Sequence, residues 1–135
     1  MRLRFPKSSR LLQRSQFLRV QRGGQRIDVG PVLAFVLPSQ TPGQGIQLGL
    51  TTSKKVGNAV FRNRLRRLMR EAARRFLLIH PSLDFDVVLI AKKGLSLELG
   101  QEKMDRALLK LVRILQKKTR EEKPVSENYS RREDA

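Results

Sequence analysis

Cysteine and tryptophan are absent from the 135-residue sequence, and histidine occurs once. The absence of cysteine excludes disulfide bonds, thiolate metal sites and a cysteine nucleophile. Long apolar runs are also missing, because the longest, residues 32–37 and 87–91, are far shorter than the roughly 20 residues that cross a bilayer. The first ten residues, MRLRFPKSSR, lack the apolar segment of a signal peptide. We therefore expect a cytoplasmic protein that does not associate with membranes.

Acidic residues are scarce, since 12 Asp and Glu stand against 29 Lys and Arg and the net charge is +17. The excess is concentrated in two windows. Residues 1–26 hold eight basic residues and no acid, and residues 54–75 hold nine basic residues and one acid, Glu71, so each window contributes +8. Basic clusters of one sign attract polyanions and release their counterions on binding. We therefore expect a nucleic-acid partner.

The length of the chain fits one domain. We expect residues 1–10 to be a flexible basic arm, residues 11–116 to be a single RNA-binding domain, and residues 117–135, which lack apolar periodicity, to be a charged, disordered tail. Hydrophobic periodicity predicts an α+β fold in the order α-β-β-α-β-α, with a small sheet of about four strands packed with helices. The predicted elements are a helix over 12–21, strands over 31–37 and 46–52 that pair as an antiparallel hairpin, a helix over 59–78, a strand over 84–91 and a helix over 97–116.

The predicted helix over residues 59–78 has two faces of different chemistry. An apolar stripe recurs every three to four residues from Phe61 to Phe76 and is expected to pack on the core. The opposite face is basic, and like charges four residues apart destabilise a helix by a few tenths of a kcal/mol per pair. A bound polyanion would relieve this repulsion. Arginine dominates the face, which favours bidentate contacts with phosphate groups.

Residues 53–71, SKKVGNAVFRNRLRRLMRE, combine a basic loop with the start of this helix. Asn58 is the expected N-cap, and the unpaired backbone N–H groups of the first turn, next to Lys54 and Lys55, suit an anion. The run resembles the sequence signature of the bacterial ribonuclease P protein component. Weaker similarity to that family extends over about residues 10–116.

The resemblance implies the protein subunit of a ribonucleoprotein endonuclease that removes the 5′ leader from precursor tRNA. The catalytic centre and its Mg²⁺ would lie in the RNA subunit, so the protein is assigned no catalytic residue and no metal ligand. The resemblance also implies a left-handed β-α-β crossover, against the usual right-handed rule. The residues assigned to binding of the RNA subunit are Lys54, Lys55, Asn58, Arg62, Asn63, Arg64, Arg66, Arg67, Arg70 and Arg74. The residues assigned to the leader, in a cleft between the first helix and the sheet, are Phe17, Phe35, Gln47, Thr51 and Lys54.

Other functions fit the sequence less well. Cleavage by the protein alone would need a general base or a metal site, but the single histidine, His80, is expected to cap a helix end, and Asp84 with Asp86 lacks a third metal ligand. A DNA-binding regulator would need a short recognition helix, and a membrane-active peptide would need an independent amphipathic segment. A ribosomal or other structural RNA-binding protein would share the charge and the arginine helix, and this alternative stays open. No protein partner is predicted.

Overall fold

The computed structural model describes residues 9–11, 13–41 and 43–134, with side chains up to Arg120. Within these residues the chain forms three α-helices and one four-stranded sheet, which confirms the predicted α+β fold. The elements in chain order are α1 (Arg14–Gly23), β1 (Gln25–Asp28), β2 (Val32–Pro38), β3 (Gln47–Thr51), the 3-10 turn η2 (Lys54–Val56), α2 (Ala59–Ala72), its π-helical continuation η3 (Ala73–Leu77), β4 (Phe85–Ala91) and α3 (Gln101–Asp134).

The strands lie in the order β1-β2-β4-β3. β2 is antiparallel to both β1 and β4, whereas β3 runs parallel to β4. The predicted hairpin of residues 31–37 with 46–52 is therefore wrong, because β4 lies between those two strands. The composition of β4 explains its place, since six of its seven residues, FDVVLIA, are buried and a strand covered on both faces belongs inside a sheet. β3, α2 and β4 form a parallel β-α-β crossover.

β1 is the strand that the sequence pattern does not reveal. It has four residues, QRID, of which only Ile27 is buried, so it shows no usable alternation of apolar and polar residues. It pairs with β2, with Ile27 opposite Ala34. A strand this short and polar is stabilised mainly by its neighbour.

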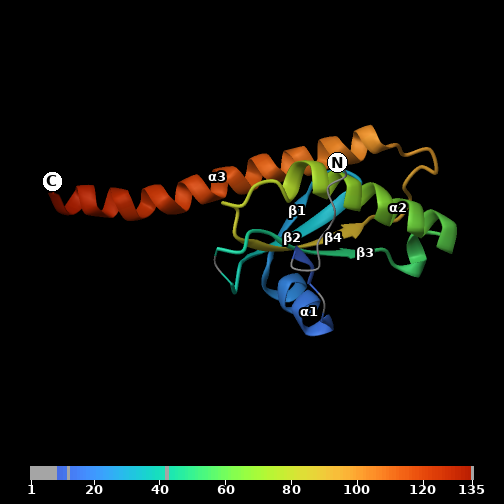
Figure 1. The fold of residues 1–135 in the computed structure, drawn as a ribbon, viewed down its shortest axis with the longest axis horizontal. Coiled ribbons are helices and arrows are strands. Elements are labelled where there is room, and N and C mark those ends of the chain that lie inside the picture. The colour runs from blue at the N-terminus through green and yellow to red at the C-terminus, as the bar shows by residue number, and fades with distance from the viewer. Residues whose placement is uncertain (1–8, 12, 42, 135) are drawn as a thin grey trace.

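Helices cover both faces of the sheet, with α2 and α3 on one side and α1 on the other (Figure 1). The main core includes Leu65 of α2, Leu108 of α3 and Leu89 of β4. A smaller apolar cluster under α1 contains Val20 and Val88. Because α1 has only ten residues, part of its face of the sheet stays accessible.

α2 and η3 together occupy residues 59–77, which confirms the predicted helix over 59–78. The predicted N-cap is also confirmed, since the side chain of Asn58 accepts a hydrogen bond from the backbone N–H of Phe61 at 2.9 Å. α3 differs from the predicted helix over 97–116, because it begins at Gln101 and continues to Asp134. Residues 117–123 are Lys, Thr, Arg and Glu, most of which favour a helix without an apolar stripe.

Most of the predicted N-terminal arm, residues 1–8, lies outside the described residues. Its last residue is already attached to the sheet, because Arg10 forms a parallel bridge with Leu48 and the N–H of Leu11 donates to the carbonyl of Leu48 at 3.0 Å. No helix in the described ranges is both long and apolar enough to cross a lipid bilayer.

Candidate nucleic-acid interface

Two lysines stand on the turn η2, immediately before α2. Lys54 and Lys55 are exposed, while Val56 is buried and anchors the turn to the core. Gly57 permits the tight junction with the helix, because a Cβ at this position would lie 2.8 Å from Cδ2 of Phe61. The two ammonium groups thus precede a helix N-terminus, where free backbone N–H groups favour anions.

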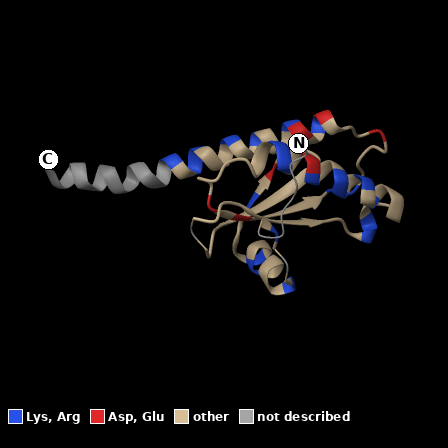
Figure 2. Ribbon diagram, viewed as in Figure 1, with Lys and Arg blue, Asp and Glu red and all other residues tan. Residues whose placement is uncertain are grey.

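Basic positions continue from η2 along α2 (Figure 2). Arg67 and Arg70 are exposed, and among the described residues no carboxylate lies within ion-pair distance of them or of the two lysines of η2. Arg62 is half-buried, and its Nε is buried without a hydrogen-bond partner in the described part of the chain. These cations keep their full charge for an anion outside the protein.

Arg66 is held by neutral groups of the protein. It donates a hydrogen bond to Oγ1 of Thr52 at 3.1 Å and another to Oδ1 of Asn63, which is exposed on the same helix. Neither acceptor carries a charge, so the guanidinium stays cationic while its direction is fixed. The RNA-binding role predicted for Arg66 and Asn63 therefore concerns a pre-oriented pair.

Arg64 lies on the side of α2 that meets the segment before α3. Its two terminal nitrogens donate to the carbonyl oxygens of Leu97, at 2.9 Å, and of Leu99. These bonds attach the segment to α2 and occupy much of the guanidinium fork. Arg64 thus has a structural role that the sequence prediction did not include.

Arg74 is the member of the predicted set that an acid neutralises. Glu71 accepts two hydrogen bonds from the guanidinium of Arg74 and one from Nε of Arg75 at 3.1 Å. Arg75 also donates to Asp105 of α3 at 3.1 Å. The hydrogen bond from Arg74 lowers the pKa of the Glu71 carboxyl group. This network joins α2 and η3 to α3 and leaves Arg74 less charge for an outside anion.

The face of the sheet toward α1 has different chemistry. Gln47, Gly49 and Thr51 alternate along β3 and share this face. Phe17 of α1 lies directly over Gly49, where a Cβ would be 2.6 Å from its ring. Phe35, two strands away, stands in the same row as Gly49, and both aromatic side chains are half-buried. The structure thus brings together four of the five residues predicted for the leader, whereas Lys54 belongs to the turn before α2.

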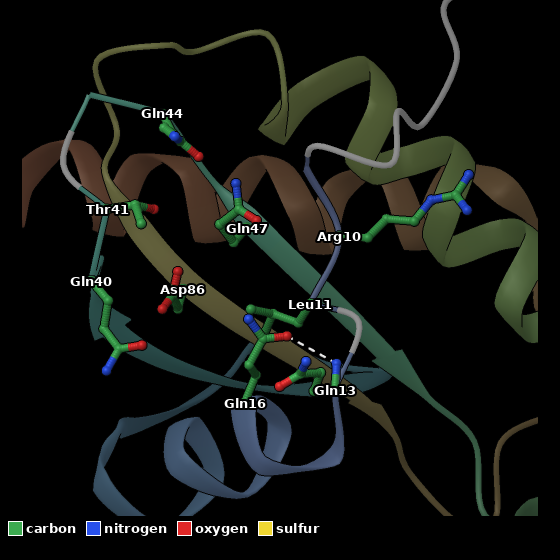
Figure 3. A pocket seen from close by; sticks show the side chains of 9 residues that line it. All are labelled: Arg10, Leu11, Gln13, Gln16, Gln40, Thr41, Gln44, Gln47 and Asp86. Atoms are coloured by element: carbon green, nitrogen blue, oxygen red, sulfur yellow. Dashed lines mark hydrogen bonds between the residues drawn. The ribbon is translucent and has the colours of Figure 1, made fainter.

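Two pockets lie on this side of the sheet, one on each side of Gly49 along β3. One, of about 320 Å³, is lined by Arg14, Phe17, Leu18, Gln21 and Thr51. The other, of about 350 Å³, is lined by Gln13, Gln16, Gln40, Gln44 and Gln47 together with Arg10, Leu11, Thr41 and Asp86 (Figure 3). Glutamine amides carry donors and acceptors without charge, which suits the edges of nucleobases.

The sequence does not predict a buried ion pair that lies under α1. Asp86 of β4 is 4% exposed, and its Oδ2 accepts a hydrogen bond from Arg19 of α1 at 2.8 Å. Arg19 also donates to the carbonyl of Pro38 at 3.3 Å. The pair attaches α1 to the sheet and so fixes the cleft between them. One signal was available, because a carboxylate inside the apolar run FDVVLIA needs a partner.

The two carboxylates considered as metal ligands are engaged elsewhere. Asp84 precedes β4 and accepts hydrogen bonds from the backbone N–H groups of Gly43, at 2.9 Å, and Gly45, at 2.8 Å. Asp86 is paired with Arg19. No group of three His, Asp or Glu side chains in the described part of the chain is placed to hold a metal ion.

Comparison with known proteins agrees with this geometry. The sequence model of the Ribonuclease P family matches residues 5–116. The ribonuclease P protein component of Geotalea uraniireducens is 37% identical over 117 residues, covering 84% of this chain and 96% of the relative, and that of Chlamydia trachomatis is 39% identical over 109 residues, covering 78% and 88%. The solved RNase P protein from Thermotoga maritima is similar with a TM-score of 0.63 at 26% identity, covering 76% of this chain and 94% of that protein. The chain belongs to the ribonuclease P protein component family.

Proposed function

We propose that this chain is the protein subunit of a ribonuclease P ribonucleoprotein in the cytoplasm. It binds the RNA subunit and the 5′ leader of precursor tRNA, and it assists the endonucleolytic cleavage that forms the mature 5′ end. Family membership supports this role. The observation that carries it is the row of exposed cations on η2 and α2 that no described carboxylate neutralises.

The basic face of α2 is proposed as the contact with the RNA subunit. Each cation that neutralises a phosphate releases condensed counterions, so Arg67, Arg70 and the two lysines of η2 supply affinity that falls with added salt. Arg66, oriented by Thr52, can meet a phosphate without first losing side-chain freedom. The face thus combines exposed cations that have no acidic partner among the described residues with Arg66, whose direction is fixed by hydrogen bonds.

The cleft between α1 and β3 is proposed as the site of the single-stranded leader. Its aromatic rings, Phe17 and Phe35, can stack with unpaired bases, which contributes about 1–3 kcal/mol per base in such sites. The neutral amides beside them can bond base edges. Mature tRNA lacks the leader and therefore has no segment for this cleft.

The catalytic centre and its Mg²⁺ are proposed to lie in the RNA subunit. Mg²⁺ held there would supply activation of water and stabilisation of negative charge on the phosphate. The protein contributes by reducing repulsion between substrate and RNA phosphates and by positioning the leader. Asp84 and Asp86 do not take part, because backbone N–H groups and Arg19 already bind them.

Reconstitution with the RNA subunit over a Mg²⁺ titration tests the proposal. We expect the protein to lower the Mg²⁺ concentration at which precursor tRNA is cleaved, and to show no cleavage in the absence of the RNA. The matched variants are Arg67→Gln with Arg70→Gln, which should raise that concentration again, and Lys93→Gln, an exposed lysine outside both sites, which should not. An unchanged Mg²⁺ requirement with the wild-type protein would contradict the proposal.

A further inference from the structure

The solvent face of α3 carries a strict basic repeat that the proposed function does not use. Residues 103–123 read KMDRALL, KLVRILQ and KKTREEK, so lysine and arginine recur as Lys-x-x-Arg-x-x-x in three successive heptads. We call these residues the α3 stripe. Its members are Lys103, Arg106, Lys110, Arg113, Lys117 and Arg120.

The stripe faces away from the protein. All six residues are exposed, and their alternating spacing of three and four residues keeps them on one side of the helix. The opposite side, with Met104, Leu108, Leu111 and Leu115, is fully buried. At a rise of about 1.5 Å per residue, the stripe is about 25 Å long. Figure 2 shows it as the succession of basic positions along α3.

Among the side chains described, which end at Arg120, acidic residues neutralise little of the stripe. Arg106 donates to Glu102 at 2.6 Å, but these side chains are 74% and 78% exposed, and such a pair contributes little. Asp105 is engaged with Arg75 of η3 instead. Among the residues whose side chains are described, no carboxylate pairs with the other five cations. The stripe therefore contains five like-charge neighbours at three- or four-residue spacing, an arrangement that destabilises an isolated helix.

Stability and solubility do not account for this arrangement. A helix selected for either property intersperses acids with bases, which adds favourable pairs and avoids a one-sided field. A one-sided ladder of cations is instead complementary to a regular polyanion, whose phosphates repeat along its backbone. No exposed aromatic residue interrupts the stripe, so it suits contacts with phosphates rather than with bases.

We propose that the α3 stripe is a second docking surface for the RNA subunit, along which a phosphate backbone lies parallel to α3. This inference rests on the proposed function. The stripe is separate from the basic face of α2, because the Glu71–Arg75–Asp105 network lies in the seam between the two helices. The protein thus contacts two segments of the RNA, one through α2 and one through α3, and holds them at a fixed spacing.

Charge reversal at the middle of the stripe tests the inference. We compare Lys110→Glu with Lys93→Glu, because both lysines are exposed, neither has an ion-pair partner among the described residues, and both variants change the net charge equally. The new glutamate of Lys110→Glu stands between Arg106 and Arg113 and should preserve or slightly raise helix stability, which thermal melting verifies. Affinity for the RNA subunit, transcribed in vitro, is measured over a salt titration.

We expect Lys110→Glu to weaken RNA-subunit binding roughly five- to tenfold near 0.1 M salt and to reduce the slope of log affinity against log salt by about 0.7–0.9. Lys93→Glu should change affinity less than about twofold, since it loses only long-range attraction. Equal losses in the two variants would show an effect of net charge alone and overturn the inference. A loss confined to the binding of precursor tRNA by the assembled ribonucleoprotein would overturn it as well.

The proposed function is tested separately in the same titration by Arg67→Gln with Arg70→Gln. If that variant loses affinity and Lys110→Glu does not, the α3 surface is refuted and the contact through α2 stands. If the wild-type protein does not bind the RNA subunit above the level of an unrelated structured RNA, both proposals are refuted.

Discussion

The outer face of α2 and the cleft under α1 use arginine in opposite ways. Arg67 is exposed and has no carboxylate partner among the described residues, whereas Arg19 is bound to Asp86, which is almost completely buried. The first can give its charge to an outside anion, and the second uses its charge to hold a helix in place. The acid beside an arginine, rather than the number of arginines, therefore determines what a basic surface can bind.

The contrast predicts that substitutions on the two surfaces affect different properties, RNA affinity on α2 and the stability of the fold under α1. On the outer face of α2, removal of Arg67 or Arg70 relieves repulsion and should change RNA affinity without loss of stability. Under α1, removal of a cation leaves a buried carboxylate unpaired and should destabilise the fold before any effect on RNA is seen. Four variants, each with a matched control, test this contrast.

Arg19→Ala should have the largest effect. It leaves Asp86 buried without its partner, and breaking a buried ion pair in this way typically costs about 3–5 kcal/mol. Because the Arg19 side chain is 26% exposed, we expect about 2–4 kcal/mol in the free energy of unfolding, measured by urea denaturation. Arg22→Ala, which changes an exposed arginine of the same helix, should stay within about 0.5 kcal/mol. Equal effects of the two variants would remove the distinction between the surfaces.

Arg67→Gln with Arg70→Gln should show the opposite behaviour. The loss of two phosphate contacts should weaken binding of the RNA subunit by about 2 kcal/mol near 0.1 M salt and reduce the salt slope by about 1.4–1.8. The free energy of unfolding should be unchanged or slightly higher, since like charges are removed. Arg75→Gln is the control, because this exposed arginine is paired with Glu71 and Asp105. Its affinity for RNA should stay close to that of the wild type.

The sequence predicts the α2 surface well because helical periodicity alone determines it. The apolar stripe from Phe61 to Phe76 defines the buried side, Asn58 marks the start, and the remaining positions must face solvent. Helical periodicity does not show which groups of the protein pair with each arginine. Arg74 shares the polar face with Arg67, and Arg64 flanks the apolar stripe. The structure adds that the carboxylate of Glu71 pairs with Arg74 and that carbonyl groups before α3 accept hydrogen bonds from Arg64.

The cleft is harder to predict because its contacts join distant parts of the chain. Arg19 and Asp86 are 67 residues apart, and their pairing depends on the place of β4 inside the sheet. The wrong hairpin prediction has the same origin, since nearness in sequence suggested that residues 31–37 pair with 46–52. The contact of Phe17 with Gly49 likewise follows only from the packing of α1.

The end of α3 shows a third reason why prediction from the sequence is incomplete. Apolar periodicity fades after Gln116 and predicts that the helix ends there, whereas α3 continues to Asp134. The period of the charged residues, Lys-x-x-Arg-x-x-x, extends through Arg120 and would have indicated a longer helix. A search for periodicity that includes charge detects elements that a hydrophobic pattern misses.

Phe17→Leu should have a smaller effect that is confined to the cleft. Leucine keeps an apolar side chain over Gly49 but removes the aromatic ring, so the fold should lose less than about 1.5 kcal/mol. Binding of precursor tRNA with a leader should weaken by about 1 kcal/mol, at the low end for one base stack. Mature tRNA should bind as before. Phe76→Leu, which changes a half-buried ring packed against the main core, is the control and should not discriminate between the two tRNAs.

Glu71→Gln should have the smallest effect on stability. It removes the carboxylate that pairs with Arg74 and so leaves this arginine without an acidic partner. The hydrogen bond from Arg74 lowers the pKa of Glu71 below the ordinary glutamate value of about 4.5, so the paired carboxylate stabilises the fold above that pH. The contribution is lost as the pH falls through the lowered pKa. It should amount to a few tenths of a kcal/mol, because Glu71 is partly exposed. Urea denaturation between pH 7 and pH 3 should therefore show a slightly weaker acid dependence in the variant than in the wild type.

At neutral pH the same variant frees Arg74 and should raise affinity for the RNA subunit by roughly twofold, with a steeper salt dependence. Asp28→Asn, which removes an exposed acid of β1 at the other edge of the sheet from β3, gives the effect of net charge alone. If the two variants bind RNA equally well, the carboxylate of Glu71 does not restrain Arg74, and the distinction between paired and unpaired arginines fails on α2 itself. A larger gain for Glu71→Gln would show that a single carboxylate is enough to keep an arginine of this helix from binding RNA.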